Sequence, residues 1–360
     1  MKFGVMLDSH VRKAEVVVEA ESLGFHRAWF CDSQMIWSDP YVAMTLAAER
    51  TSRIQIGTGV THPGTRIAPV TANAIACINA LAPGRTFLGL ATGHTSMRMI
   101  GQPPATIAAL QEYVRVVRGL LAGEGIEYAQ GKHSAEIAFL QLDRRYIDIS
   151  SSIPIFVGAN GPRALRLAGE LGEGWIAAAM TADAARDGMA RVREGAALAG
   201  RALSPDFVAC NTISACVLRS GDKLTDRRIV DQTGSMVTAN LHFAYEIWLQ
   251  AGRPDSLIPA HFADIWDEYV ARVDGFSLPP RARFRQIHEG HATYLVEEER
   301  RFVTPAGIRA SVVIGSPSEI VEQIEAMASA DVNEIALIPP ADFQREIFRD
   351  FAEHVMPRFR

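Results

Sequence analysis

Hydrophobic positions along the chain repeat with two different periods, and the two alternate almost from end to end. Short apolar runs bounded by glycine, proline or polar residues predict strands, and longer stretches with apolar residues three or four positions apart predict helices. The expected strands are Lys2–Leu7, Arg27–Cys31, Arg53–Thr58, Thr86–Ala91, Ile153–Val157, Gly174–Ala178, Phe207–Leu218 and Glu334–Ile338. The expected helices are residues 12–23, 39–50, 69–81, 106–122, 163–171, 182–199, 225–250, 317–329 and 343–355.

Eight strands that alternate with helices, without a linker-like tract, predict an α/β fold: a closed (β/α)8 TIM barrel as one domain over residues 1–360. A doubly wound sheet is the alternative, but it usually has fewer units or divides into two domains. Two segments depart from the alternation. Residues 124–152 form a longer excursion that suits a hairpin, and residues 251–304 fit no simple βα unit. We interpret the second segment as a helical insertion before the last βα unit.

The carboxyl ends of the strands are where a parallel barrel places its active site. Two consecutive strand-like segments, 53–63 and 85–96, end in glycine and small polar residues and are separated by one helix pattern. Glycine at a strand end gives up side-chain packing, so it usually allows a ligand or another backbone to come close. This βαβ unit therefore predicts a flat or phosphorylated ligand over its carboxyl strand ends.

Three side chains at these ends are candidates for proton transfer. Asp32 follows the second strand, where a carboxylate can hydrogen-bond a ring N–H, act as a base or simply cap a turn. His10 and His94 follow the first and fourth strands, and histidine is the side chain most readily tuned for proton transfer at neutral pH. Each of the two also suits a hydrogen-bonded structural role. His62 precedes Pro63, and we interpret it as a residue that shapes a loop.

A glycine-containing loop after the fifth strand, Gly158-Ala-Asn-Gly-Pro-Arg163, is the best phosphate-binding candidate. Its glycines allow a close backbone approach, and the following helix presents free N–H groups and its positive dipole end. A plain βα turn is the alternative. The segment Thr92-Gly-His-Thr-Ser96 could supply hydroxyl donors to the same anion, so the two loops support each other.

Composition and missing motifs narrow the function further. A net charge of −5 and a pI near 6.1 argue against a nucleic-acid surface. The first residues are too polar for a signal peptide, and no apolar run reaches the roughly 18 residues of a membrane span, so we expect a cytoplasmic protein. Dinucleotide, P-loop and serine-hydrolase motifs are absent. The four cysteines form no CxxC pair, and His288 and His291 lack further ligands, so no metal site is expected.

Five segments carry a resemblance to a known family: Ala20–Asp32, Thr51–Val60, Ala80–Gly93, Ile155–Leu165 and Ile314–Ile324. In these segments the chain resembles the bacterial luciferase-like superfamily of flavin or deazaflavin enzymes, and it is similar to the methylenetetrahydromethanopterin reductase-like subgroup. The resemblance implies a (β/α)8 barrel, usually as a homodimer.

The resemblance also implies roles for particular residues. A non-proline cis peptide of the relatives, which supports the isoalloxazine ring, matches Gly59–Val60, and their acidic residue near the ring edge matches Asp32. Ser33 stands where many relatives have histidine, and His94 where sugar-phosphate dehydrogenases have glutamate, which leaves FMN and a deazaflavin coenzyme both open. The phosphate loops of the relatives match Thr92, Gly93 and Thr95 together with Ala159, Asn160, Gly161 and Arg163.

Our first interpretation of the function is a monooxygenase that uses reduced FMN from a separate flavin reductase and inserts one oxygen atom of O2 into a small organic substrate. The protein would orient the ring, exclude water and donate hydrogen bonds from His10 and His94. The alternative is a deazaflavin-dependent hydride-transfer enzyme without oxygen chemistry, and a more remote one is a non-catalytic flavin-binding barrel. The aromatic residues of the insertion suggest either an apolar substrate lid or helix packing.

Overall fold

The computed structural model describes residues 1–359, which divide into two compact units. The first contains Met1–Thr212 and Ala326–Ala336, and the second contains Ile213–Glu325 and the chain from Leu337 onward. Among the described residues, no helix combines the length and apolar composition that crossing a membrane requires. The expectation of a single domain stays a prediction.

A closed barrel forms the first unit, with the strand order β1-β12-β9-β8-β7-β4-β3-β2. The neighbouring pairs from β1 through β2, β3, β4, β7 and β8 to β9 are parallel, so the predicted TIM-type barrel is confirmed. The strands are β1 (Lys2–Leu7), β2 (Arg27–Phe30), β3 (Gln55–Thr61), β4 (Thr86–Leu90), β7 (Ile155–Gly158), β8 (Gly174–Ala178), β9 (Val208–Ile213) and β12 (Glu334–Leu337).

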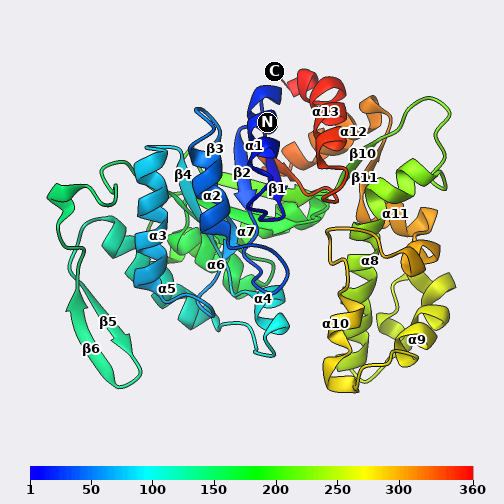
Figure 1. The fold of residues 1–360 in the computed structure, drawn as a ribbon, viewed down its shortest axis with the longest axis horizontal. Coiled ribbons are helices and arrows are strands. Elements are labelled where there is room, and N and C mark those ends of the chain that lie inside the picture. The colour runs from blue at the N-terminus through cyan, green and yellow to red at the C-terminus, as the bar shows by residue number, and fades with distance from the viewer. Residues whose placement is uncertain (360) are drawn as a thin grey trace. The chain divides into compact units, whose positions relative to one another are not determined.

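Helices of the first unit surround the barrel (Figure 1). The N-terminal cap of α5 is where the sequence predicts the helix to begin. Thr106 Oγ1 accepts the Ala109 N–H at 3.1 Å. Two helices touch backbone to backbone, since a Cβ at Gly169 of α6 would lie 1.8 Å from Val192 O of α7. The helices are α1 (Ala14–Leu23), α2 (Pro40–Ala48), α3 (Ala68–Leu81), α4 (His94–Met99), α5 (Ile107–Leu121), α6 (Pro162–Leu171) and α7 (Ala182–Leu198).

The excursion at residues 124–152 contains an antiparallel hairpin, β5 (Ile126–Gln130) and β6 (His133–Ile137). Gly131, in its two-residue turn, has a φ of 63°, a conformation that glycine adopts at little cost. Figure 1 shows the hairpin reaching out beyond α3 and α5. A short 3₁₀ turn, η1 (Leu142–Arg144), follows it.

A buried charged pair lies among the aromatic side chains of the barrel. Arg27 of β2 pairs with Glu334 of β12, and neither side chain is more than 6% exposed. Trp29 Nε1 donates to Glu334 Oε1 at 3.0 Å, and the Arg27 guanidinium lies 5.1 Å from the centroid of the Phe156 ring. The pair therefore joins the second strand to the last one across the sequence.

Helix packing dominates the second unit. Its long helix α8 buries Tyr245 and Trp248 against Trp266, Tyr269 and Phe302, as the helix-packing alternative for the aromatic residues predicts. The elements are β10 (Ala215–Val217), β11 (Val313–Gly315), α8 (Arg227–Gln250), η2 (Asp255–Leu257), η3 (Ala260–Ile265), α9 (Trp266–Asp274), η4 (Pro280–Ala282), α10 (Phe284–Ile287), η5 (Glu297–Phe302), α11 (Pro305–Ser311), α12 (Pro317–Ala328), α13 (Gln344–His354) and η6 (Met356–Phe359).

The predicted strand Phe207–Leu218 is wrong as a single element. The chain changes partners at Ser214: β9 stays in the barrel, whereas β10 pairs with β11 outside it. Both pieces are buried on every side, so the apolar run continues across the break and hides it. The helices α4 and α11 were not predicted because their six and seven residues are too short to show a period.

Candidate functional site

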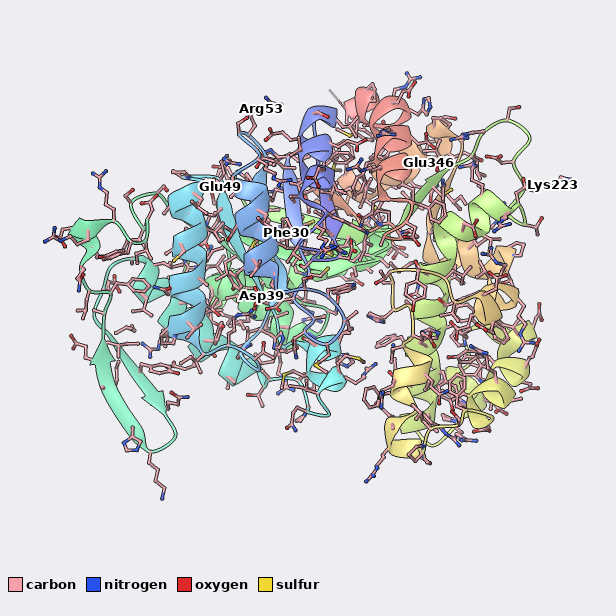
Figure 2. All side chains as sticks on the ribbon, viewed as in Figure 1. Phe30, Asp39, Glu49, Arg53, Lys223 and Glu346 are labelled. Atoms are coloured by element: carbon pink, nitrogen blue, oxygen red, sulfur yellow. The ribbon has the colours of Figure 1, made fainter. Side chains whose placement is uncertain are left out.

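The predicted site residues of the first unit follow five strands that are consecutive in the barrel: β1, β2, β3, β4 and β7. Figure 2 shows Phe30 at the end of β2 and Asp39 at the beginning of α2, and the loop between them contains Asp32. Since parallel strands end at the same edge, the structure brings the loops with Asp32, Val60, Thr92 and Ala159 to one rim of the barrel.

The end of β3 departs from regular strand geometry. The pairing of β3 with β4 shifts between Thr58 and Thr61, and the Gly59–Val60 peptide bond within this bulge is cis, as the resemblance implies. A bulge takes a peptide out of the ladder and re-aims its side chains. A Cβ at Gly89 of β4 would lie 3.1 Å from Val60 Cγ1 and 2.2 Å from Thr58 O, so glycine is required beside the bulge.

Asp32 is buried at this rim and is held by the last residue of β3 and by the loop after it. Its Oδ2 accepts hydrogen bonds from Thr61 Oγ1 at 2.6 Å and from Arg66 Nη1 at 3.0 Å. Both bonds end on the same carboxylate oxygen. A carboxylate that is fixed in this way can accept a hydrogen bond from a ring N–H or take up a proton.

Arg66 links Asp32 to the beginning of α2. Its second terminal nitrogen pairs with Asp39, which also caps α2, and its guanidinium lies 4.8 Å from the centroid of the Tyr41 ring. Burial disfavours the charged form of Arg66, but Asp32 and Asp39 outweigh burial and raise its pKa. The loops after β2 and β3 therefore form one ionic network.

His62 and Ser96 form a second network at the same rim. His62 is fully buried, and its Nε2 lies 2.7 Å from Ser96 Oγ. The Gln34 side-chain amide donates to Ser96 O at 3.0 Å, so the loops after β2 and β3 meet α4 at Ser96. Gln34 Oε1 is buried with no hydrogen-bond partner among the described residues. An unsatisfied buried acceptor of this kind suits a donor supplied by a ligand or a water molecule.

His10 and His94 both have exposed residue positions at the rim. His10 Nδ1 accepts the Arg12 N–H at 3.0 Å, and Arg98 Nη2 lies 3.2 Å from His94 Nδ1. Each imidazole is therefore oriented by a residue close to it in sequence, in the loop after β1 for His10 and in α4 for His94. Their predicted catalytic roles stay predictions.

In the candidate phosphate loop after β7, Ala159 is held by a hydrogen bond, and the residues that follow it are exposed to solvent. Trp175 Nε1 donates to Ala159 O at 2.7 Å, whereas Asn160, Gly161 and Arg163 are exposed. A Cβ at Gly161 would meet no atom within 4 Å. The loop thus offers polar groups and space beside the first turn of α6, and the binding roles of these residues and of Thr92, Gly93 and Thr95 stay predictions.

Two further observations concern other kinds of site. Among residues 1–359, no group of three or more His, Cys, Asp or Glu side chains is arranged to hold a metal ion. A depression of about 500 Å³ lies in the second unit, and carboxylates there pair with its arginines. None of the predicted site residues lines it. Its lining residues are Arg272, Glu297, Glu298, Arg300 and Arg301.

The sequence interpretation includes Ser96 among possible anion donors and gives His62 a loop-shaping role, but it assigns no contacts to the residues that hold the rim together: Gln34, Thr61, His62, Arg66 and Ser96. Their partners lie about 30 residues or more away, as in the 34-residue separation between His62 and Ser96, and no local pattern reports such a pairing. The available signal was position, because each of them follows a predicted strand on a loop of the carboxyl side.

Comparison with protein families identifies the family of this chain. The model of the luciferase-like monooxygenase family matches residues 1–334. The chain belongs to the luciferase-like monooxygenase family. Members of the luciferase-like family resemble this chain along its whole length. A 5,10-methylenetetrahydromethanopterin reductase of Methanopyrus kandleri is 28% identical over 383 aligned residues, which cover 100% of this chain and 99% of that protein.

Other luciferase-like relatives are similar over part of the chain or in fold. An F420-dependent hydroxymycolic acid dehydrogenase of Mycobacterium tuberculosis is 36% identical over 195 residues, 51% of this chain and 52% of that protein. The structure of the coenzyme F420 dependent tetrahydromethanopterin reductase from M. kandleri aligns over 100% of this chain and 99% of its own, with a TM-score of 0.70 and 22% identity. The chain is thus an oxidoreductase of this family, which uses flavin or deazaflavin cofactors.

Proposed function

We propose that this protein transfers hydride between the deazaflavin coenzyme F420 and a small organic substrate. The observation that carries the proposal is the full-length similarity to methylenetetrahydromethanopterin reductases, at 28% and 27% identity in two archaea. A relative that matches half of the chain at 36% identity is also named as F420-dependent. This is the alternative of the sequence interpretation, and it has more support than the FMN monooxygenase.

The rim of the barrel fits a deazaflavin. The pyrimidine edge of such a ring carries N–H and C=O groups, and the rim offers the buried acceptor Gln34 Oε1 and the Asp32 carboxylate. The bulge at Gly59–Val60 interrupts the strand ladder and gives a short platform. Asn160 and Arg163 are exposed polar groups for the phosphate of the coenzyme side chain.

A bound deazaflavin supplies two-electron hydride chemistry that needs no oxygen. The residues of this chain then bind and orient it: Asp32, fixed by Thr61 and Arg66, aligns the ring edge, and Val60 supports one face. His94 and His10 hold or move a proton beside the reacting centre. Pre-formed hydrogen bonds at the rim lower the cost of ordering the site when the ligand binds.

A reduced-FMN monooxygenase, served by a separate flavin reductase, is the second candidate. It is favoured by the fold of the oxygenating constituent of 3,6-diketocamphane monooxygenase from Pseudomonas putida, which was solved with FMN and aligns with a TM-score of 0.62 at 15% identity. Similarity at this level concerns the fold, and this candidate therefore has the weaker support.

Turnover without oxygen separates the two candidates. We expect the absorbance band of oxidised or reduced F420 to change on addition of one member of a panel of alcohols, aldehydes and pterins under anaerobic conditions. Oxygen uptake that depends on FMNH2 and the same panel would instead support the monooxygenase. Binding of either coenzyme without any turnover would point to a non-catalytic barrel.

We also propose a homodimer formed by α2 and α3. Val42 and Val70 on these adjacent helices are 51% and 50% exposed, and Leu81 is 41% exposed; a second subunit on this face would cover these apolar side chains. The double change Val42→Glu and Val70→Glu should raise the dimer dissociation constant by about 100-fold, because two charges would be buried. Sedimentation velocity measures it, with Leu198→Glu as control. A monomeric wild type would contradict the proposal.

A further inference from the structure

The hydrogen bonds around His62 define which ring nitrogen carries the proton. The backbone N–H of Gly64 donates to Nδ1 at 3.2 Å, so Nδ1 is an acceptor. Burial and, to a smaller extent, the charge of Arg66 lower the pKa of His62, against the opposing effect of Asp32. The ring is therefore neutral at pH 7. A neutral imidazole whose Nδ1 accepts has its proton on Nε2.

This proton points to Ser96 in the first turn of α4. With Nε2 as donor to Ser96 Oγ at 2.7 Å, the hydroxyl hydrogen of Ser96 is left for Gly93 O at 3.4 Å. The Gln34 amide holds the main-chain oxygen of the same serine. Ser96 is thus fixed from two neighbouring loops, and both of its partners are at least partly buried.

The His62 ring also occupies the space in which a side chain at position 93 would lie. Gly93 has a φ of 79°, and a Cβ there would lie 2.4 Å from His62 Cγ. The turn consequently requires glycine for both conformation and space. Gly93 O accepts the Met97 N–H at 2.9 Å, which makes this amide a reporter of the turn.

We propose that His62 is a positioning residue of the cofactor site: its Nε2–H···Ser96 Oγ bond and its ring hold the Gly93–Ser96 turn, and hence Thr95 and His94, in place. This inference rests on the proposed function, because that function places His94 beside the reacting centre, and on the family resemblance, which matches Thr95 to a phosphate loop. His62 acts from below the turn, and the coenzyme need not touch it.

Two variants of His62 separate hydrogen bonding from packing. His62→Phe keeps a ring but removes both nitrogens, whereas His62→Gln keeps an amide donor near the position of Nε2. His62→Phe loses the bond to Ser96 and also the Gly64 N–H···Nδ1 bond within its own loop, but only the bond to Ser96 reaches the neighbouring turn. We therefore expect the Kd for F420 to rise about tenfold in His62→Phe and to stay within about threefold of wild type in His62→Gln. Ser96→Ala should show the same loss, and the double variant no further one. Equal affinities of wild type and His62→Phe, or additive losses in the double variant, would overturn the proposal.

The protein without coenzyme gives an independent measurement. Nitrogen NMR should show the proton of His62 on Nε2, and amide exchange at Met97 should accelerate about tenfold in His62→Phe. A proton on Nδ1, or unchanged exchange at Met97, would overturn the role of His62 even if F420 binds. If the wild type shows the expected tautomer and exchange but binds no F420, the proposed function fails, while the part of His62 in holding the turn is supported.

Discussion

Replacing Glu334 by glutamine is expected to lower the free energy of unfolding by about 3–5 kcal/mol, the usual effect of removing one partner of a buried ion pair. The change leaves the Arg27 guanidinium charged, inside the barrel and without its carboxylate. Arg27 Nε already lacks a hydrogen-bond partner, so the remaining charge has little to compensate it. The pair also joins β2 to β12, so its loss should loosen the closure of the barrel. Urea unfolding followed by circular dichroism measures the effect.

An exposed ion pair of the same unit provides the control. Arg193 and Asp331 are 2.7 Å apart, but their side chains are 56% and 51% exposed, so Asp331→Asn should change stability by less than about 1 kcal/mol. The double change Arg27→Met and Glu334→Leu removes both buried charges and should recover most of the loss. If Glu334→Gln unfolds at the same urea concentration as the wild type, the buried pair does not stabilise the barrel as we propose.

Replacing Asp32 by alanine should lower kcat/KM with F420 and substrate by about 100-fold, roughly 2.7 kcal/mol. The carboxylate is buried, so its removal leaves Thr61 and Arg66 without their shared partner and takes away the acceptor for the ring edge. The barrel itself should remain folded, because the network lies at the rim and outside the core. Steady-state kinetics, with circular dichroism as a check of folding, measure the effect.

Asp39→Ser is the matched control for Asp32. It removes the other carboxylate that pairs with Arg66, but serine keeps a cap for α2. The Asp39 side chain is 43% exposed, so we expect kcat/KM to fall by less than about threefold. Similar losses in both variants would show that Arg66, rather than the Asp32 carboxylate, is the group that matters.

The barrel could be predicted from the sequence because its signal is local and repeated. Each strand and each long helix shows its own period, and the cap at Thr106 or the turn at Gly131 depends on neighbours a few residues away. Even the positions of the ligand-facing loops follow, since they must come after strands. The cis bond at Gly59–Val60 came from the family resemblance and not from the residues themselves.

The contacts that shape the rim were not predictable in the same way. Thr61 and Arg66 meet Asp32 across 29 and 34 residues, and such pairings exist only after the strands have closed into a barrel. His62 illustrates the limit: its neighbour Pro63 suggested a loop-shaping role, but the bond to Ser96 depends on the register of β3 against β4. The split at Ser214 was hidden for a related reason, because a change of strand partner leaves the apolar run unbroken.

The central claim is that the rim around Asp32, Val60 and the β7 loop binds F420 and prefers it to FMN. Its most direct test is a pair of equilibrium titrations of the wild-type protein with F420 and with FMN, followed by fluorescence. We predict that F420 binds at least about tenfold more tightly than FMN, a difference of roughly 1.4 kcal/mol. We also predict that Asp32→Ala weakens the binding of F420. Tighter binding of FMN, or no binding of F420, would contradict it.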